Sequence, residues 1–335
     1  MVKDVVVCDG VVKITIELTT PACPMKEQIQ NDVQAAVRQL DGVKQVNVDF
    51  TANVAPMAPQ QRAAESNPLP GVKHIVAVGA GKGGVGKSTV AVNIAVGLAR
   101  EGAKVGLMDG DIYGPSLPTL LGLANATPQT TGGNMIVPFD VHGVKSMTIG
   151  KLVEPDKPLI WRGPMAHGAF RQLATQTDWG QLDYLIIDLP PGTGDVPLTM
   201  SQLLPLTGAV VVCTPQKVAQ DDARRAIAMF RQLEIKLLGV VENMSYFIGD
   251  DGKTYDIFGR GGAQAMAKDM GLPFLGAIPI HMDLRANSDN GDPTGNFTRN
   301  DQLADELETV VKTLAGQISI HAASSTFQQP TISIG

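Results

Sequence analysis

Two lysines stand in one glycine-rich segment, "GKGGVGKST", at residues 81–89. Gly81, Gly86, Lys87 and Ser88 fill the fixed positions of the pattern G-x-x-x-x-G-K-[ST]. In such a loop, backbone N–H groups surround phosphate oxygens, the last lysine reaches the β- and γ-phosphates, and the hydroxyl after it can bind Mg²⁺. The segment predicts a nucleotide-binding loop made of Gly81, Lys82, Gly83, Gly84, Val85, Gly86, Lys87, Ser88 and Thr89.

Three aspartates follow apolar runs elsewhere in the chain. Asp109 and Asp111 end "VGLMDGD", and Asp188 ends "LIID". Magnesium prefers hard oxygen ligands and hydrolysis needs a positioned water, so carboxylates are expected beside a phosphate loop. We expect Asp188 to hold Mg²⁺ through its water shell, Asp109 to support the metal and Asp111 to orient the attacking water, although these roles are interchangeable within the set. Any one of them alone would also fit a turn or a helix cap.

The elements around these residues alternate between short apolar runs and helical stretches. The runs are "HIVAVGA", "KVGLMDGD", "DYLIIDLPPG", "GAVVVCTP", "LLGVVENM" and "FLGAIPI". Such uniformly apolar strands are typical of a parallel sheet covered on both faces, so we predict a doubly wound, mostly parallel α/β domain. Ligands of these sheets lie beyond the carboxyl ends of the strands, which is where the loop and the aspartates follow.

The chain divides into four predicted parts. Residues 1–50 read as a small α+β unit of ββαβ order, in which Asp9-Gly10 makes a hairpin turn and a helical pattern follows "TTPACP". Residues 51–71 are rich in Pro, Ala and Gln and read as a linker. Residues 72–317 form the large domain, and residues 318–335 read as a polar tail.

Composition excludes several classes of function. The chain has 335 residues, 44% of them hydrophobic, with no apolar run of membrane-spanning length and no signal-peptide pattern, so we expect a cytoplasmic protein. A net charge of −6 argues against binding to nucleic acid. Three scattered cysteines cannot form a disulfide framework, and the five histidines lack metal-ligand spacing.

The segment "KGGVGKST" resembles the deviant Walker A motif of the MinD, ParA, ArsA and nitrogenase iron-protein superfamily. In isolation Lys82 would be read as a solvent-exposed lysine. The resemblance implies instead that Lys82 crosses a homodimer to the partner's nucleotide. An ammonium that arrives only when two subunits close would stabilise the charge of the transition state, as an arginine finger does. Hydrolysis would then be coupled to closure of the dimer.

Further motifs resemble the Mrp/ApbC family of iron-sulfur cluster carrier ATPases, over nearly all of residues 72–315. They are "DGDIYGPSLP", "WRGPM", "DYLIIDLPPGTGD", "CTPQ" and "ENMSYF". The resemblance implies ATP and Mg²⁺ as cofactors, with apoprotein recipients and cluster-assembly proteins as partners and neither nucleic acid nor membrane. By resemblance, Asn243 recognises adenine and Arg162 lies near the nucleotide-sensing region. A strand-end cap is the alternative for Asn243.

The cysteines depart from the family pattern. Many members carry a C-x-x-C pair after "ENMSYF" that bridges a [4Fe-4S] cluster across the dimer, whereas this chain reads "IGDDGKTYDIFGRGG" there. The amino-terminal unit resembles a small domain often fused to this family. In it Cys23 precedes Pro24, which suits the first position of a helix, where a thiolate is favoured. Cys23 is thus either a cluster ligand or an inert buried cysteine.

Three functions are compatible with these motifs. The first is an ATP-hydrolysing carrier that binds a cluster and transfers it to apoproteins. The second is a positioning ATPase of the MinD or ParA kind, and the third is a regulatory scaffold ATPase without a cluster. Positioning ATPases need a basic amphipathic terminus or surface, whereas residues 318–335 contain neither Lys nor Arg. We therefore favour the carrier.

Overall fold

A computed structural model describes residues 1–56, 67–133, 135–152, 163–249 and 251–326. The chain forms two compact units, one made of Met1–Ala58 with Ala315–Gly335 and the other of Pro59–Leu314. Arg162 and residues 57–66 of the predicted linker lie outside the described residues. None of the helices in the described ranges is both apolar enough and long enough to cross a membrane.

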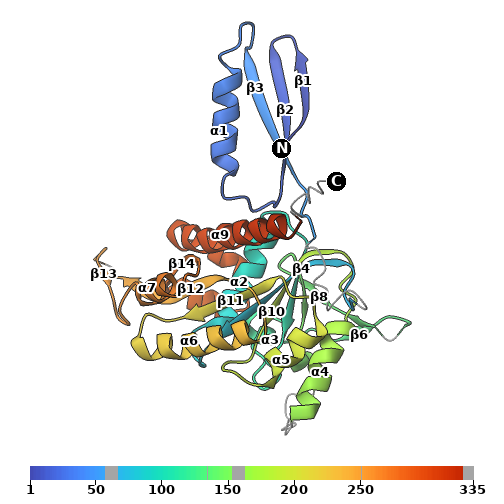
Figure 1. Ribbon diagram of the computed structural model, residues 1–335, viewed down its shortest axis with the longest axis vertical. Coiled ribbons are helices and arrows are strands. Elements are labelled where there is room, and N and C mark those ends of the chain that lie inside the picture. Colours follow the sequence, from blue (N-terminus) through green and yellow to red (C-terminus); the bar gives the residue numbers. More distant parts are fainter. Residues whose placement is uncertain (57–66, 134, 153–162, 250, 327–335) are drawn as a thin grey trace, which may run out of the picture. The chain divides into compact units, whose positions relative to one another are not determined.

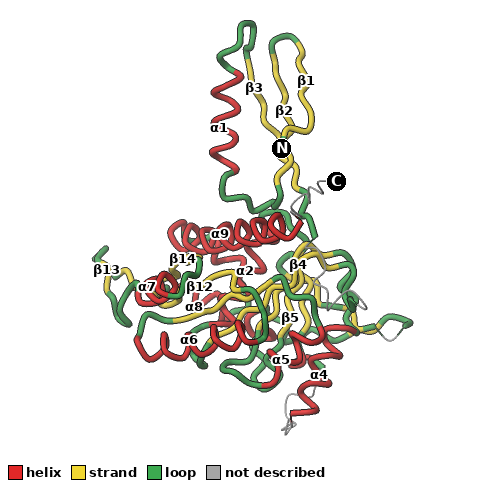
Figure 2. The backbone as a smooth tube through the Cα atoms, viewed as in Figure 1, coloured by secondary structure: helices red, strands yellow, loops and turns green. Residues whose placement is uncertain are grey.

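The small unit has the predicted ββαβ order. Its elements are β1 (Val2–Cys8), β2 (Val11–Leu18), α1 (Lys26–Val37) and β3 (Gln45–Ala52). Strand β2 lies in the centre, antiparallel to β1 and parallel to β3, and α1 lies alongside the strands (Figure 2). Asp9 and Gly10 both have positive φ, at 51° and 84°, which confirms the predicted hairpin turn. Alternate residues of β2 are buried, so one face of this sheet forms the core of the unit.

The large unit is built on an extended sheet, which confirms the predicted doubly wound, mostly parallel α/β fold. Its strands run in the order β13-β12-β11-β4-β10-β5-β9-β8, and β14 pairs with β12. Within the described residues, only the pairings of β8 with β9 and of β13 with β12 are antiparallel in this sheet. The strands are β4 (Val72–Ala80), β5 (Val105–Asp109), β8 (Phe139–Val141), β9 (Val144–Met147), β10 (Leu182–Asp188), β11 (Gly208–Cys213), β12 (Leu237–Ile248), β13 (Thr254–Tyr255) and β14 (Phe274–Ile280).

Helices cover both faces of this sheet (Figure 1). The helices after β4 in the described residues are α2 (Lys87–Arg100), α3 (Leu117–Leu120), η1 (Ile149–Lys151), α4 (Gly163–Thr175), α5 (Asp195–Leu203), α6 (Lys217–Gln232), α7 (Gly262–Asp269), α8 (Met282–Asp289), η2 (Pro293–Phe297) and α9 (Asp301–Thr326). Strands β6 (Gln129–Thr130) and β7 (Ile136–Val137) pair as a separate two-stranded sheet. On β4, Ile75 and Ala77 share a core with Phe170 of α4 and Phe230 of α6. Helix α2 contacts β4, β5 and β10.

The carboxyl-terminal helix corrects one sequence prediction. Helix α9 continues to Thr326, through residues 318–326 that we expected in a polar tail. Ile318 and Ala322, four residues apart, are both buried, so they lie on one face of the helix and extend its apolar stripe. Residues 327–335 lie outside the described residues.

Candidate nucleotide site

The glycine-rich loop joins the end of β4 to the start of α2, as predicted. Gly86 is the N-cap of α2 and has a φ of 80°. A Cβ atom there would lie 2.2 Å from Nδ2 of Asn243, and one at Gly81 would lie 2.1 Å from the backbone carbon of Asp222. These contacts leave no room for a side chain. At Gly81 and Gly86 only backbone fits, and the first turn of α2 that follows carries free N–H groups that can bind phosphate.

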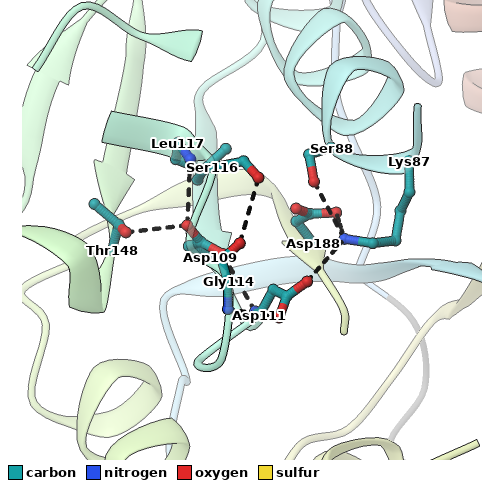
Figure 3. A network of polar contacts seen from close by, with 9 residues as sticks. All are labelled: Lys87, Ser88, Asp109, Asp111, Gly114, Ser116, Leu117, Thr148 and Asp188. Atoms are coloured by element: carbon teal, nitrogen blue, oxygen red, sulfur yellow. Dashed lines mark hydrogen bonds and ion pairs between the residues drawn. The ribbon is translucent and has the colours of Figure 1, made fainter. Parts of the chain in front are cut away.

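Lys87 is buried among the predicted carboxylates (Figure 3). Its Nζ atom lies 2.6 Å from Oδ1 of Asp188 and 3.9 Å from Oδ2 of Asp111, and it donates to the hydroxyl of Ser88 at 3.2 Å. The structure thus brings together four of the residues predicted from separate motifs. Asp188 balances the charge of the lysine, and a phosphate that reached Lys87 would compete with this carboxylate.

Only one of the two carboxylate oxygens of Asp188 contacts Lys87. The residue is fully buried at the end of β10, and its Oδ2 atom has no hydrogen-bond partner in the described part of the chain. Burial raises the pKa of Asp188, and Lys87 opposes this rise. A buried oxygen without a partner is costly, so Oδ2 is free to accept a bond from water or to bind a cation. Together with the nearby Ser88 hydroxyl it forms an all-oxygen donor set that fits Mg²⁺.

Asp109 holds the segment that follows β5. Its Oδ1 accepts from the N–H of Asp111 at 3.2 Å, and its Oδ2 accepts from the N–H of Leu117 at 3.3 Å and the hydroxyl of Thr148 at 3.0 Å (Figure 3). Both oxygens are engaged with this segment. The support of the metal predicted for Asp109 would therefore act through the placement of its neighbours, and direct ligation remains a prediction.

Asp111 is the least buried of the three aspartates. Its side chain is 13% exposed, and its Oδ1 accepts from the N–H of Gly114 at 3.2 Å. Burial raises the pKa of Asp111, while the charge of Lys87 lowers it. The carboxylate thus lies 3.9 Å from Lys87 and keeps some contact with solvent. The predicted role in orienting water fits this position and stays a prediction.

Burial, with the charge of Asp188 as the second cause, raises the pKa of Asp109 from 3.8 to about 7. The folded, nucleotide-free protein therefore binds a proton that the unfolded chain releases at lower pH. We expect the free energy of unfolding to fall as pH rises through this window and to level off above it. Thr148→Val removes a donor to the carboxylate, so it should raise the pKa of Asp109 further and extend the fall to higher pH.

Urea denaturation of both proteins between about pH 5 and pH 8 measures this effect. Thr148→Ser, which retains the hydroxyl, is the matched control. Parallel stability curves for wild type and Thr148→Val would show that Asp109 does not titrate in this range.

Asn243 contacts the loop in a way that the sequence did not predict. It is buried on β12, and its Nδ2 donates to the carbonyl of Val85 at 2.8 Å. The amide therefore braces the phosphate loop, while its recognition of adenine remains a prediction. Glu242 beside it, also buried, accepts from the N–H groups of Gly261 and Ala263 at 2.8 and 2.7 Å. A glutamate in the apolar run "LLGVVEN" was the one sign of this anchor in the sequence.

Lys82 stands apart from the carboxylates. The ion pairs among the described residues include Lys87 and leave Lys82 out. Its side chain is half-buried on the loop. Its charge acts on Cys213, where it opposes the rise in the pKa of the thiol to about 12 that burial and Glu242 produce. Cys213 is therefore a neutral, packed thiol, as the sequence indicated.

The other cysteines lie in the small unit, at opposite ends of β2. Cys8 precedes the hairpin turn and is exposed, and Cys23 follows the strand and is half-buried. Eight extended residues between them span roughly 25 Å, too far to share one cluster within a chain. Helix α1 begins at Lys26, so the prediction that Pro24 takes its first position is wrong. Within the described residues, no group of three His, Cys, Asp or Glu side chains is arranged to hold a metal ion.

A phosphate loop after a central parallel strand, with a lysine and carboxylates from the neighbouring strand ends, defines a P-loop NTPase. Comparison with known proteins adds the family within this class. Residues 71–315 match the model of the NUBPL iron-transfer P-loop NTPases, and the chain belongs to this family. Residues 1–50 match the model of the iron-sulfur cluster assembly proteins.

Curated relatives match most of the chain. A protein from Synechocystis named iron-sulfur cluster carrier protein is 47% identical over 96% of this chain and 92% of its own. The protein of that name from Escherichia coli is 42% identical over 88% of this chain and 83% of its own. The iron-sulfur cluster transfer protein NUBPL of Dictyostelium discoideum is 48% identical over 75% of this chain and 79% of its own.

Solved structures agree with the fold. A nucleotide-binding protein from Archaeoglobus fulgidus, determined in complex with ADP, has a TM-score of 0.60 and 39% identity and covers 68% of this chain and 89% of its own. The cell-division protein MinD of Aquifex aeolicus has a TM-score of 0.52 at 21% identity, over 72% of this chain and 97% of its own, which supports the fold alone.

Proposed function

We propose that this protein binds and hydrolyses ATP as a homodimer, and that it carries an iron-sulfur cluster and transfers it to apoproteins. The observation that carries the proposal is the 47% identity over 96% of the chain to a protein named iron-sulfur cluster carrier. The site supports the ATPase part, because a buried lysine and an unpartnered carboxylate oxygen meet at the phosphate loop. Apoprotein recipients and cluster-assembly proteins are the proposed partners.

The residues of this site divide the work of hydrolysis. Lys87 leaves Asp188 and binds the β- and γ-phosphates, and the N–H groups of the loop surround these phosphates. Ser88 and Asp188 would hold Mg²⁺, which neutralises phosphate charge when bound. Asp111 orients the attacking water from the front of the site, and Asp109 keeps that segment in place. Asn243 holds the carbonyl of Val85, which preserves the curl of the loop, and its proposed second role is to recognise adenine.

The homodimer explains the second lysine. Lys82 has no carboxylate partner among the described ion pairs, so its ammonium is available to a nucleotide in a second copy. Exposed apolar side chains follow three strands of this sheet: Tyr113 after β5, Val218 after β11, and Ile257 and Phe258 after β13. We propose that exposed apolar residues of this kind contribute to the contact with the second subunit.

Cys23 is the proposed ligand of the cluster. Cys213 is the less suitable ligand, because it is buried in the core and burial raises the pKa of its thiol to about 12, which disfavours the thiolate that binds iron. Cys8 and Cys23 cannot act on one cluster within a chain, as the length of β2 separates them. One thiolate per subunit gives two across a dimer, and the remaining ligands of the cluster would come from outside this set.

Anaerobic reconstitution with iron and sulfide tests the carrier function. We expect the wild-type protein to gain the thiolate-to-iron charge-transfer band and, after incubation with an apo-ferredoxin and separation of the two proteins, to have lost the band to the ferredoxin. Cys23→Ser should abolish the band, and Cys213→Ser, the matched control, should retain it. A wild-type protein that hydrolyses ATP but binds no iron would instead favour a regulatory scaffold ATPase, and uptake of a cluster speaks against a positioning ATPase.

A further inference from the structure

Three buried asparagines form a chain of hydrogen bonds that ends on the P-loop helix. Asn93 lies on α2, Asn287 on α8 and Asn296 on η2, and each is at most 4% exposed. Asn287 donates to Oδ1 of Asn296 at 3.0 Å, Asn296 donates to Oδ1 of Asn93 at 2.9 Å, and Asn93 donates to the carbonyl of Thr89 at 2.8 Å. Thr89 belongs to the first turn of α2, two residues after Lys87.

The chain of amides begins on a cation near the surface. Arg299 donates through Nη1 to Oδ1 of Asn287 at 2.8 Å and through Nη2 to Asp292 at 2.6 Å. Its side chain is 59% exposed, whereas the amides behind it are buried. The series therefore runs from solvent to the start of the P-loop helix.

The two ends fix the direction of every amide between them. A guanidinium can only donate and a backbone carbonyl can only accept. Each asparagine must therefore turn its oxygen toward Arg299 and its NH₂ group toward Thr89. The arrangement admits a single orientation, and hydrogen bonds aligned in this way polarise one another in a site of low dielectric constant.

Close packing surrounds this chain of amides. A Cβ atom on Gly295 would lie 2.9 Å from Oδ2 of Asp292 and 3.1 Å from Cγ of Asn287. On the side of α2, a Cβ atom on Gly97 would lie 2.6 Å from Cγ2 of Val311 and 3.2 Å from the ring of Phe297. Gly97 lets η2 and α9 approach α2 closely and Gly295 lets η2 approach Asn287 of α8, so a shift of the amides cannot be absorbed by free space.

We infer that Asn93, Asn287 and Asn296 are positioning residues that set the register of α2 and thereby place Lys87 and Ser88 for the phosphates. The inference rests on the proposed nucleotide binding and adds residues outside the loop to it. Loss of a donor within the series would leave a buried oxygen unpaired and let the first turn of α2 move. The affinity for nucleotide would fall, since its contacts require a fixed geometry.

Asn296→Asp is the central test, because it keeps the shape of the side chain and removes the donor to Asn93. We expect the Kd for a fluorescent ADP to rise about tenfold and the KM for ATP to rise more than kcat falls. Arg299→Gln, at the exposed end, should change the Kd in the same direction by less. Asn290→Asp is the matched control, because Asn290 is an exposed asparagine of the same segment, and it should bind like wild type.

Leu204→Ala separates positioning from loss of stability. Leu204 is buried in the core on the opposite side of the sheet, so its truncation lowers the Tm without touching the amide series. At a temperature well below both transitions, Leu204→Ala should bind ADP like wild type and Asn296→Asp should not. Should Asn296→Asp fail to fold, Asn93→Ser and Arg299→Gln are measured in its place.

Three outcomes decide the inference. A raised Kd in the amide variants alone supports it. Equal Kd values for the amide variants and Leu204→Ala at matched Tm would overturn it while leaving the proposed function intact. A wild-type protein that binds no ADP would overturn the proposed function, and the positioning role with it.

Discussion

Replacing Lys82 with alanine is expected to leave ATP binding nearly unchanged and to remove almost all ATP hydrolysis. Lys82 takes no part in the ion pairs around Lys87, so its loss leaves the charges of its own site in place. A cation supplied by a second subunit to the terminal phosphate accelerates hydrolysis by about 10³ to 10⁵ in related chemistry. We expect a loss of this order in kcat, with a Kd for ATP close to that of wild type.

A mixture of two inactive variants tests whether Lys82 acts across the dimer. In a heterodimer of Lys82→Ala with Lys87→Ala, the first subunit keeps its own Lys87 and receives Lys82 from the second, so one site is complete. Random mixing makes half of the dimers heterodimers with one such site, which predicts recovery of about a quarter of the wild-type rate. No recovery, or a wild-type rate for Lys82→Ala alone, would refute the action in trans.

Replacing Lys87 with alanine should have the other large effect, on nucleotide binding and on stability together. The phosphates lose a charge-assisted contact in a site shielded from water, which costs about 10²- to 10³-fold or more in turnover. Asp188 also loses the cation at 2.6 Å while it stays fully buried. Breaking a buried pair in this way destabilises proteins by about 3–5 kcal/mol.

The pH dependence of this loss has a definite sign. Without Lys87 the pKa of Asp188, already raised by burial, rises further, so the folded variant takes up a proton that the unfolded chain releases. The stability of Lys87→Ala should therefore fall relative to wild type as pH rises above the carboxylate's usual value of 3.8.

A double-mutant cycle provides the control for this prediction. Asp188→Asn on the Lys87→Ala background removes the unpaired charge, so it should restore much of the stability and none of the hydrolysis. Urea denaturation and ATP turnover measure the two quantities separately. If the double variant is no more stable than Lys87→Ala, the buried pair is not the source of the loss.

The sequence was sufficient to predict the parts of the site that depend on local patterns. Fixed glycine and lysine positions predicted the loop, and uniformly apolar runs predicted the parallel strands that bring Asp111 and Asp188 to Lys87. The carboxyl ends of parallel strands lie at one edge of the sheet, and the contacts with Lys87 form because β4, β10 and β5 are neighbours in it.

Contacts between distant segments could not be predicted in this way. Asn93 and Asn296 are 203 positions apart, and no spacing rule relates them. The bond from Asn243 to Val85 depends on the packing of β12 against the loop. The start of α1 was misplaced because Pro24 is compatible with a turn as well as with a first helical position. The polar appearance of "HAASST" hid the continuation of α9, since alanine favours helix without adding much hydrophobicity.

The bond between Lys87 and Asp188 makes nucleotide capture an exchange reaction. An incoming phosphate competes with an internal anion that already holds the ammonium at 2.6 Å, so the apparent affinity is lower than the new contacts alone would give. The same competition favours release of the product, because Asp188 pairs again with the Lys87 ammonium as the product nucleotide dissociates. We therefore expect the competition of Asp188 for Lys87 to lower the affinity for nucleotide and to speed the release of product.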